Sequence, residues 1–183
     1  MDKWIGVLVA VIIVAVVAWL MLRSWKRRTV RDETLSSYPL PAELGTPAFE
    51  TEVLYVATTP ASEPLERLAV AGLAFRGSAR IEVLAEGVIL RIAGESTTFI
   101  PADRLLGAGL ASYAIDRGVE PEGLVALTWI PLEREPAEVE PRVDSYVRAR
   151  YPGDPARIVR AVNDIAAAPA ARRPKQESEA SDD

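Results

Sequence analysis

Few residues in this chain could do chemistry, and their types limit what that chemistry could be. The 183 residues include no histidine and no cysteine, which excludes imidazole and thiolate catalysis, thiolate zinc sites and disulfides. Two carboxylate pairs, Glu50/Glu52 and Glu138/Glu140, are of the types that a general acid and base require. Such pairs more often form a solvated strand face or loop, which is the interpretation adopted. We therefore assign no catalytic, metal-binding or cofactor-binding residue, and expect no enzymatic activity and no cofactor.

Nucleotide-binding and calcium-binding motifs are also missing from the sequence. No glycine-rich loop leads into a lysine, and no Asp-x-Asp-x-Asn-Gly pattern occurs. Gly107-Ala108-Gly109 is only a fragment of a dinucleotide fingerprint, so it predicts a turn or a close packing contact instead.

The distribution of charge argues against nucleic acid as a partner. Residues 32–183 hold 15 basic and 25 acidic side chains, a net charge of −10. Residues 49–133 alone carry 6 basic and 12 acidic side chains, a net charge of −6. A nucleic-acid binder is expected to present a basic surface, and this chain has none in its C-terminal part.

An uncharged apolar run near the N-terminus predicts a transmembrane helix. Residues 4–22 (WIGVLVAVIIVAVVAWLML) are nineteen residues without a charge. A helix of that length spans about 28 Å, close to the ~30 Å hydrocarbon core of a bilayer. Trp4 and Trp19 suit the two interfacial regions, and the span ends at Leu22. A buried helix of a soluble protein would carry a polar stripe, which this run lacks.

A cluster of cations follows the run and predicts both retention of the anchor and its orientation. A cleaved signal peptide would show small residues at a cleavage site and few cations after its apolar core. The positive-inside rule places the basic flank, and the C-terminal bulk of the chain, in the cytoplasm, with the N-terminus outside. The same cations could contact anionic lipid, at about 1 kcal/mol each. They are Arg23, Lys26, Arg27, Arg28 and Arg31.

The remainder of the chain divides into a linker, one domain and a tail. We expect a membrane anchor over residues 1–25, a basic neck and proline-containing linker over 26–48, a domain over 49–168, and a disordered tail over 169–183. Short β-prone runs predict strands over residues 50–58, 68–75, 79–84, 88–92, 97–100, 113–116 and 124–130. Residues 79–92 form a predicted hairpin about Ala85-Glu86-Gly87, and Gly72 marks a bulge or close packing.

A helix is predicted to close the domain. Asp154 is a suitable N-cap and Pro155 occupies the favoured first position. Ile158, Val159, Val162 and Ile165 recur at helical spacing on a helix ending near Ala168. Such a stripe usually covers a core, although a groove for a partner is an alternative. Trp129 is likewise expected in the core. The fold class is therefore mainly β with a C-terminal α-helix, as a small barrel or sandwich.

This layout resembles a pleckstrin-homology-like (PH-like) domain. It is similar to actinobacterial single-pass membrane proteins with a bacterial PH-like domain, from the anchor to about Ile165. The resemblance is carried by RGSARIEVLAEGVILRI (residues 76–92), IPADRLLGAGLAS (100–112) and EGLVALTWIPL (122–132). It implies the fold and the membrane tether, and supplies no settled biochemical activity.

The resemblance also allows phosphoinositide binding to be examined. PH domains that bind these lipids place several Lys and Arg residues around the loop between the first two strands. Residues 58–67 offer Glu63, Glu66 and one cation, Arg67, so phosphoinositide binding is not expected.

The sequence thus predicts a membrane-anchored cytoplasmic module that binds or scaffolds other components. Its expected partners are the lipid bilayer and membrane-associated proteins. The alternative is an accessory subunit of a membrane transport or cell-envelope complex, in which the small residues Gly6 and Ala10 let the anchor pack against another helix.

Overall fold

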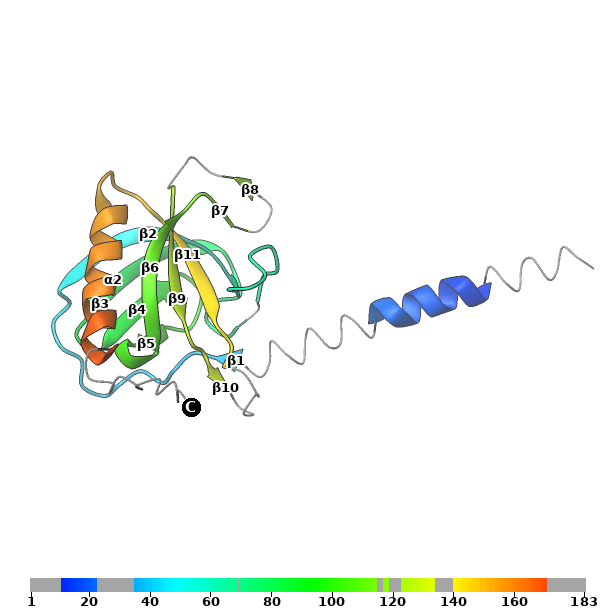
Figure 1. Ribbon diagram of the computed structural model, residues 1–183, viewed down its shortest axis with the longest axis horizontal. Helices are drawn as coiled ribbons and strands as arrows, with labels where there is room; N and C mark the ends of the chain where they lie inside the picture. Colours follow the sequence, from blue (N-terminus) through cyan, green and yellow to red (C-terminus); the bar gives the residue numbers. More distant parts are fainter. Residues whose placement is uncertain are drawn as a thin grey trace, which may run out of the picture.

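The computed structural model describes residues 11–22, 35–68, 70–114, 117–118, 123–133 and 140–170 of the chain. Residues 11–22 form a helix, and the remaining described residues form a β-rich domain closed by a second helix (Figure 1). The fold class predicted from the sequence, mainly β with a C-terminal helix, is confirmed.

A seven-stranded antiparallel sheet forms the body of the domain. Its order is β5-β4-β3-β2-β11-β9-β6. Strands β2 to β5 therefore lie side by side in chain order, and the later strands β11, β9 and β6 lie on the other side of β2. The strands are β2 (Phe49–Pro60), β3 (Gly77–Leu84), β4 (Gly87–Ile92), β5 (Thr98–Pro101), β6 (Leu105–Ala111), β9 (Leu124–Trp129) and β11 (Val143–Ala149). A 3-10 turn, η1 (Ala102–Arg104), connects β5 to β6, and β7 (Tyr113–Ala114) pairs with β8 (Arg117–Gly118).

Helix α2 (Asp154–Ala170) packs beside β6 and covers the core (Figure 1). Asp154 begins the helix and is 6 % exposed; it accepts hydrogen bonds from the Thr51 hydroxyl and from Arg157. Ile158 and Val162 are fully buried, which confirms that the apolar stripe lies on the core.

One side chain of α2 also protects a strand of the sheet. The Ala108 N–H donates to Asn163 Oδ1 at 2.8 Å, and Asn163 Nδ2 donates to the Ala108 carbonyl at 3.0 Å. The carboxamide therefore makes the two bonds that a neighbouring strand would make, at the edge strand β6. Gly107 leaves room for it, because a Cβ there would lie 3.0 Å from Asn163 Oδ1.

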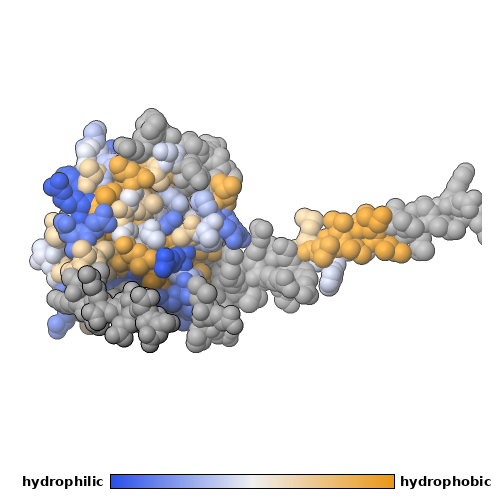
Figure 2. Space-filling view, viewed as in Figure 1, coloured by the Kyte–Doolittle hydropathy of each residue, from blue (hydrophilic) through white to orange (hydrophobic). Residues whose placement is uncertain are grey.

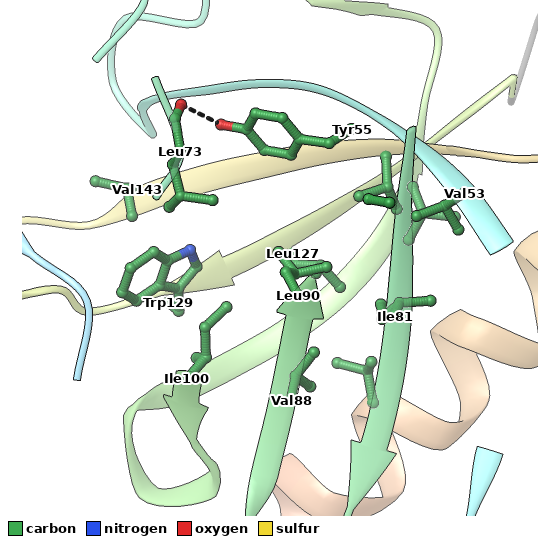
Figure 3. Close-up of a cluster of buried hydrophobic side chains, with 14 of the residues drawn as sticks. Val53, Tyr55, Leu73, Ile81, Val88, Leu90, Ile100, Leu127, Trp129 and Val143 are labelled. Carbon is green, nitrogen blue, oxygen red and sulfur yellow. Dashed lines mark hydrogen bonds between the residues drawn. The ribbon is translucent and has the colours of Figure 1, made fainter. Parts of the chain in front are cut away.

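A chain of buried hydrogen bonds crosses the interior of the domain, and the groups at its two ends determine which atom donates in each bond. Trp129 Nε1 donates to Ser145 Oγ at 2.9 Å, and Ser145 bonds Thr58 Oγ1 at 2.7 Å. Thr58 bonds the Tyr55 hydroxyl at 2.8 Å, and that hydroxyl donates to the Leu73 carbonyl at 2.8 Å (Figure 3). The indole can only donate and the carbonyl can only accept, so each hydroxyl between them accepts one bond and donates the next.

One predicted strand differs from the structure. Residues 68–75 are predicted to form a strand, but the described residues 68 and 70–75 contain none: a turn lies at Ala71-Gly72, and Leu68, Val70 and Leu73 are buried in the core. Their alternating apolar pattern reflects a segment folded into the sandwich. Close packing at Gly72 is confirmed, since a Cβ there would lie 2.8 Å from the Ser96 carbonyl oxygen.

The segment around Gly107-Ala108-Gly109, expected as a turn or close contact, is strand β6, although the close contact at Gly107 exists. Strand β11 was not predicted at all. It has a register shift between Tyr146 and Val147 and takes its partners from distant parts of the chain, β2 and β9.

The expected linker is in part a strap on the domain. Residues 35–48 lie against the sheet: β1 (Leu35–Ser36) pairs with β10 (Leu132–Glu133), and the Tyr38 hydroxyl donates to the Ile130 carbonyl at 3.2 Å. Tyr38 and Leu44 pack on a second small core. The folded domain therefore begins at Leu35 instead of residue 49.

The directed hydrogen-bond chain yields a stability prediction. Replacing Ser145 by Ala leaves the buried Trp129 N–H without its acceptor, which should lower the free energy of unfolding by about 1–3 kcal/mol. The exposed Ser62→Ala variant is the matched control. Urea unfolding of the full-length protein in detergent, followed by near-ultraviolet circular dichroism, measures both; equal midpoints would contradict the structural importance of the chain.

Candidate functional site

The segment between β2 and β3, here called the β2–β3 loop (residues 61–68 and 70–76), is the longest connection in the described domain. It leaves β2 through a bond from the Ala61 N–H to the Arg142 carbonyl at 2.9 Å. The Leu68 N–H then donates to the Thr58 carbonyl at 2.8 Å, which returns the chain to the end of β2. The loop is therefore an ordered part of the core.

Arg67 joins the two arms of this loop. Its Nη1 donates to the Ala74 carbonyl at 2.9 Å and its Nη2 donates to the Val56 carbonyl at 2.6 Å. Both bonds run from a charged donor to main-chain oxygens, which are among the stronger hydrogen bonds in proteins. Arg67 is thus occupied in holding the loop.

The loop exposes two large apolar side chains. Leu65 is 65 % exposed and Phe75 is 73 % exposed, the highest values among the large apolar residues in the described part of the domain. Leu65 precedes Arg67 on one arm, and Phe75 follows Ala74 on the other. The sequence pattern did not indicate either side chain, because residue 75 lies in a run that predicts a strand and residue 65 lies in the loop before it.

A second candidate is a polar groove on the outer face of β2, β3 and β4, with a volume of about 390 Å³. Three arginines line it, Arg80, Arg91 and Arg150, and each belongs to an ion pair. Arg150 lies 2.7 Å from Glu52, Arg91 lies 2.8 Å from Glu82, and Arg80 lies 3.8 Å from Glu50. The hydrogen bond to Glu82 raises the pKa of Arg91.

These pairs leave the groove with little net charge. The side chains of Arg80, Arg91 and Arg150 are 45–59 % exposed, so each pair contributes roughly 0–1 kcal/mol. The arrangement is a ladder of balanced charges across neighbouring strands. It contains no surplus cation that would hold an anion.

Three of the four carboxylates considered for acid–base chemistry are paired with arginines. Glu50 is paired with Arg80, Glu52 is paired with Arg150, and Glu140 lies 3.2 Å from Arg104. Glu138 lies outside the described residues. Within the described ranges no group of three or more Asp or Glu side chains could hold a metal ion. Trp129 is fully buried, as predicted.

The predicted membrane span is described only over residues 11–22. This helix is uncharged and exposed at every position, including Trp19 and Leu22, and Figure 2 shows it as mostly hydrophobic surface. None of the helices in the described ranges is both long and apolar enough to cross a bilayer. The other predicted membrane residues lie outside the described ranges: Trp4, Arg23, Lys26, Arg27, Arg28 and Arg31.

Strand order and the closing helix define a PH-like sandwich. A family described as bacterial PH domain-like matches residues 34–163, more than half of the chain. The chain therefore belongs to the bacterial PH domain-like family. The match begins one residue before β1, so it includes the strap as well as the sheet. No curated protein matches the chain.

The arginine that joins the loop arms can be tested by a conservative substitution. Arg67→Lys keeps the charge but replaces the planar fork by a single ammonium, which cannot reproduce both main-chain bonds. We expect the loop to open more readily by about 1.5–3 kcal/mol, seen as faster amide hydrogen exchange over residues 70–75. The exposed Arg76→Lys change should leave exchange unaltered; equal protection in both variants would show that Arg67 does not hold the loop.

Stability at alkaline pH provides a second test. Burial raises the pKa of Tyr55 far above its ordinary 10.0, because the charged phenolate would lose its hydration. The unfolded chain releases this proton near pH 10, whereas the folded chain retains it. The contribution of Tyr55 to stability is therefore fully present below pH 10 and falls as the pH rises further.

The corresponding experiment compares unfolding free energies at neutral pH and above pH 10. Tyr55→Phe should be less stable at neutral pH, and its stability should decline less steeply with alkali than that of the unmodified protein. Tyr151→Phe, at a side chain that is 52 % exposed, is the control. An unchanged slope in Tyr55→Phe would contradict the assignment.

Proposed function

We propose that this protein is a membrane-anchored module that binds or scaffolds other membrane-associated components and has no catalytic activity of its own. Its PH-like domain lies in the cytoplasm and its N-terminus outside. The observation that carries the proposal is the helix of residues 11–22, which is uncharged and exposes its apolar side chains on every side.

An apolar helix of this kind needs an apolar environment. Ten of its large side chains, Trp19 among them, are 48–70 % exposed, which is far more apolar surface than a soluble monomer usually presents. In the sequence, residues 4–10 extend the same uncharged run toward the N-terminus. A bilayer accommodates a helix that is apolar around its circumference, and this supports the anchor.

The composition of the domain supports binding over catalysis. It has no histidine or cysteine, and three of its acidic side chains, Glu50, Glu52 and Glu140, are paired with arginines. A tethered binding surface benefits from effective concentration, because confinement to a membrane lets a weak interface engage neighbouring proteins.

The anchor can be tested in intact cells. The unmodified chain should stay with membranes after alkaline carbonate extraction, and Val14→Asp/Val17→Asp should be released, since each buried carboxylate costs roughly 2.5–3.5 kcal/mol at the centre of a span. Tyr151→Asp, in the domain, should remain with membranes. Release of the unmodified chain would contradict the anchor.

The orientation of the chain in the membrane can be tested with a single introduced cysteine, because the sequence contains none. A single Ser181→Cys substitution should react with a membrane-impermeant maleimide only after the cells are permeabilised. Reaction in intact cells would place the C-terminus outside and contradict the cytoplasmic location.

Proximity labelling from the C-terminus then addresses the partners. Labelling of a single membrane complex that is lost when the anchor is exchanged for an unrelated span would favour the accessory-subunit alternative. Retained labelling after that exchange would favour binding through the domain. Turnover of a substrate by the purified full-length chain would contradict a purely binding function.

A further inference from the structure

The exposed side chains of Leu65 and Phe75 belong to an ordered loop, so their exposure is a built feature. Leu68, Val70 and Leu73 of the same loop are buried, at 0–1 % exposure. The bond from Arg67 to the Ala74 carbonyl holds together the two arms from which Leu65 and Phe75 project. The loop thus directs one set of apolar side chains into the core and presents two to the outside.

This loop lies at the end of the sandwich where the N-terminal strap begins. Pro60, the last residue of β2, pairs with Val143, which pairs in turn with Trp129, the last residue of β9. At about 4.8 Å per strand, Pro60 and Trp129 lie roughly 10 Å apart. The chain reaches β10 three residues after Trp129, and β10 pairs with β1.

The strap shortens the connection between the domain and the N-terminal helix. If the domain began at residue 49, the 26 residues 23–48 would separate the two; because β1 begins at Leu35, only the 12 residues 23–34 do. A chain of that length spans at most about 45 Å. The end of the domain that carries β1 and the β2–β3 loop is therefore the end tied to the anchor.

The charge of the loop permits contact with a membrane. Its formal charges, Glu63, Glu66, Arg67 and Arg76, balance, whereas residues 49–133 together carry a net charge of −6. An anionic leaflet that repels the domain as a whole does not repel this loop. An apolar contact made here should depend little on the charge of the lipid headgroups.

We propose that Leu65 and Phe75 insert into the boundary between headgroups and acyl chains of the bilayer that holds the anchor. This inference rests on the proposed anchor and adds a second contact, which orients the domain. The lipid surface is the occupant because the covalent connection brings this end of the domain to it. The β3–β4 turn, about 25 Å away at the far end of β3, then faces the cytoplasm.

The chain lacks cysteine, so the contact can be measured with single labels on the full-length protein in vesicles. A fluorophore at Ser62→Cys reports on the loop while Leu65 and Phe75 stay native, and one at Ala85→Cys reports on the β3–β4 turn. Lipids carrying a nitroxide near the headgroup should quench the Ser62 label several-fold more than the Ala85 label. Introducing Leu65→Asp/Phe75→Asp should reduce quenching at Ser62 to the level at Ala85.

The same vesicles separate failure of this inference from failure of the anchor. Vesicles of phosphatidylcholine alone, and with added phosphatidylglycerol, should give equal quenching, and the protein should float with both. Flotation without quenching at Ser62 would overturn the inference and leave the anchor standing. Loss of flotation would overturn both. Quenching only with phosphatidylglycerol would overturn apolar insertion and favour an electrostatic contact. If nitroxide lipids do not quench the Ser62 label, and the label becomes more shielded from solvent as protein density in the vesicles rises, the loop contacts a second copy of the chain and the inference is overturned.

Discussion

The structure depends on one directed chain of buried hydrogen bonds, which runs from the Trp129 indole through Ser145, Thr58 and Tyr55 to the Leu73 carbonyl. It joins β9, β11 and β2 and ends in the β2–β3 loop. Each hydroxyl accepts once and donates once, so no member can be removed without leaving a buried polar group unpaired. The chain therefore determines where the loop lies, and with it where Leu65 and Phe75 emerge from the domain.

Local signals predicted the parts of the fold whose partners are close in sequence. The hairpin of β3 and β4 was predicted about Ala85-Glu86-Gly87, and in the structure Leu84 pairs with Gly87, so that Ala85 and Glu86 form its turn. Helix α2 followed from Asp154, Pro155 and an apolar stripe, and it begins where expected. In both, the residues that decide the structure lie within a few positions of one another, so a sequence pattern can carry the information.

The parts that could not be predicted take their partners from far along the chain. Strand β6 contains Gly107 and Gly109, which weaken a strand locally; it forms because β9 pairs with it and Asn163 protects its edge. The strap begins at Leu35 because β10 pairs with it. For the candidate site, the sequence predicted that the β2–β3 loop has few cations, and this stays a prediction about its ligands. The sequence could not show which apolar residues of the loop are buried, since the loop around Leu73 is held by the Tyr55 bond to the Leu73 carbonyl and by the packing of Gly72 against Ser96, both contacts between residues far apart in the chain.

Strand β2 connects the two ends of the molecule. Near its start, Thr51 donates to Asp154 at the beginning of α2; near its end, Thr58 and Tyr55 hold the loop. A force applied through the strap at β1 therefore acts on a domain whose sheet, helix and loop are linked through one strand. If the proposed anchor holds the chain in a bilayer, such a body should turn as a unit at its surface. The proposed contacts of Leu65 and Phe75 with the bilayer, together with the short connection of residues 23–34, would then determine which surfaces of the domain a partner can reach.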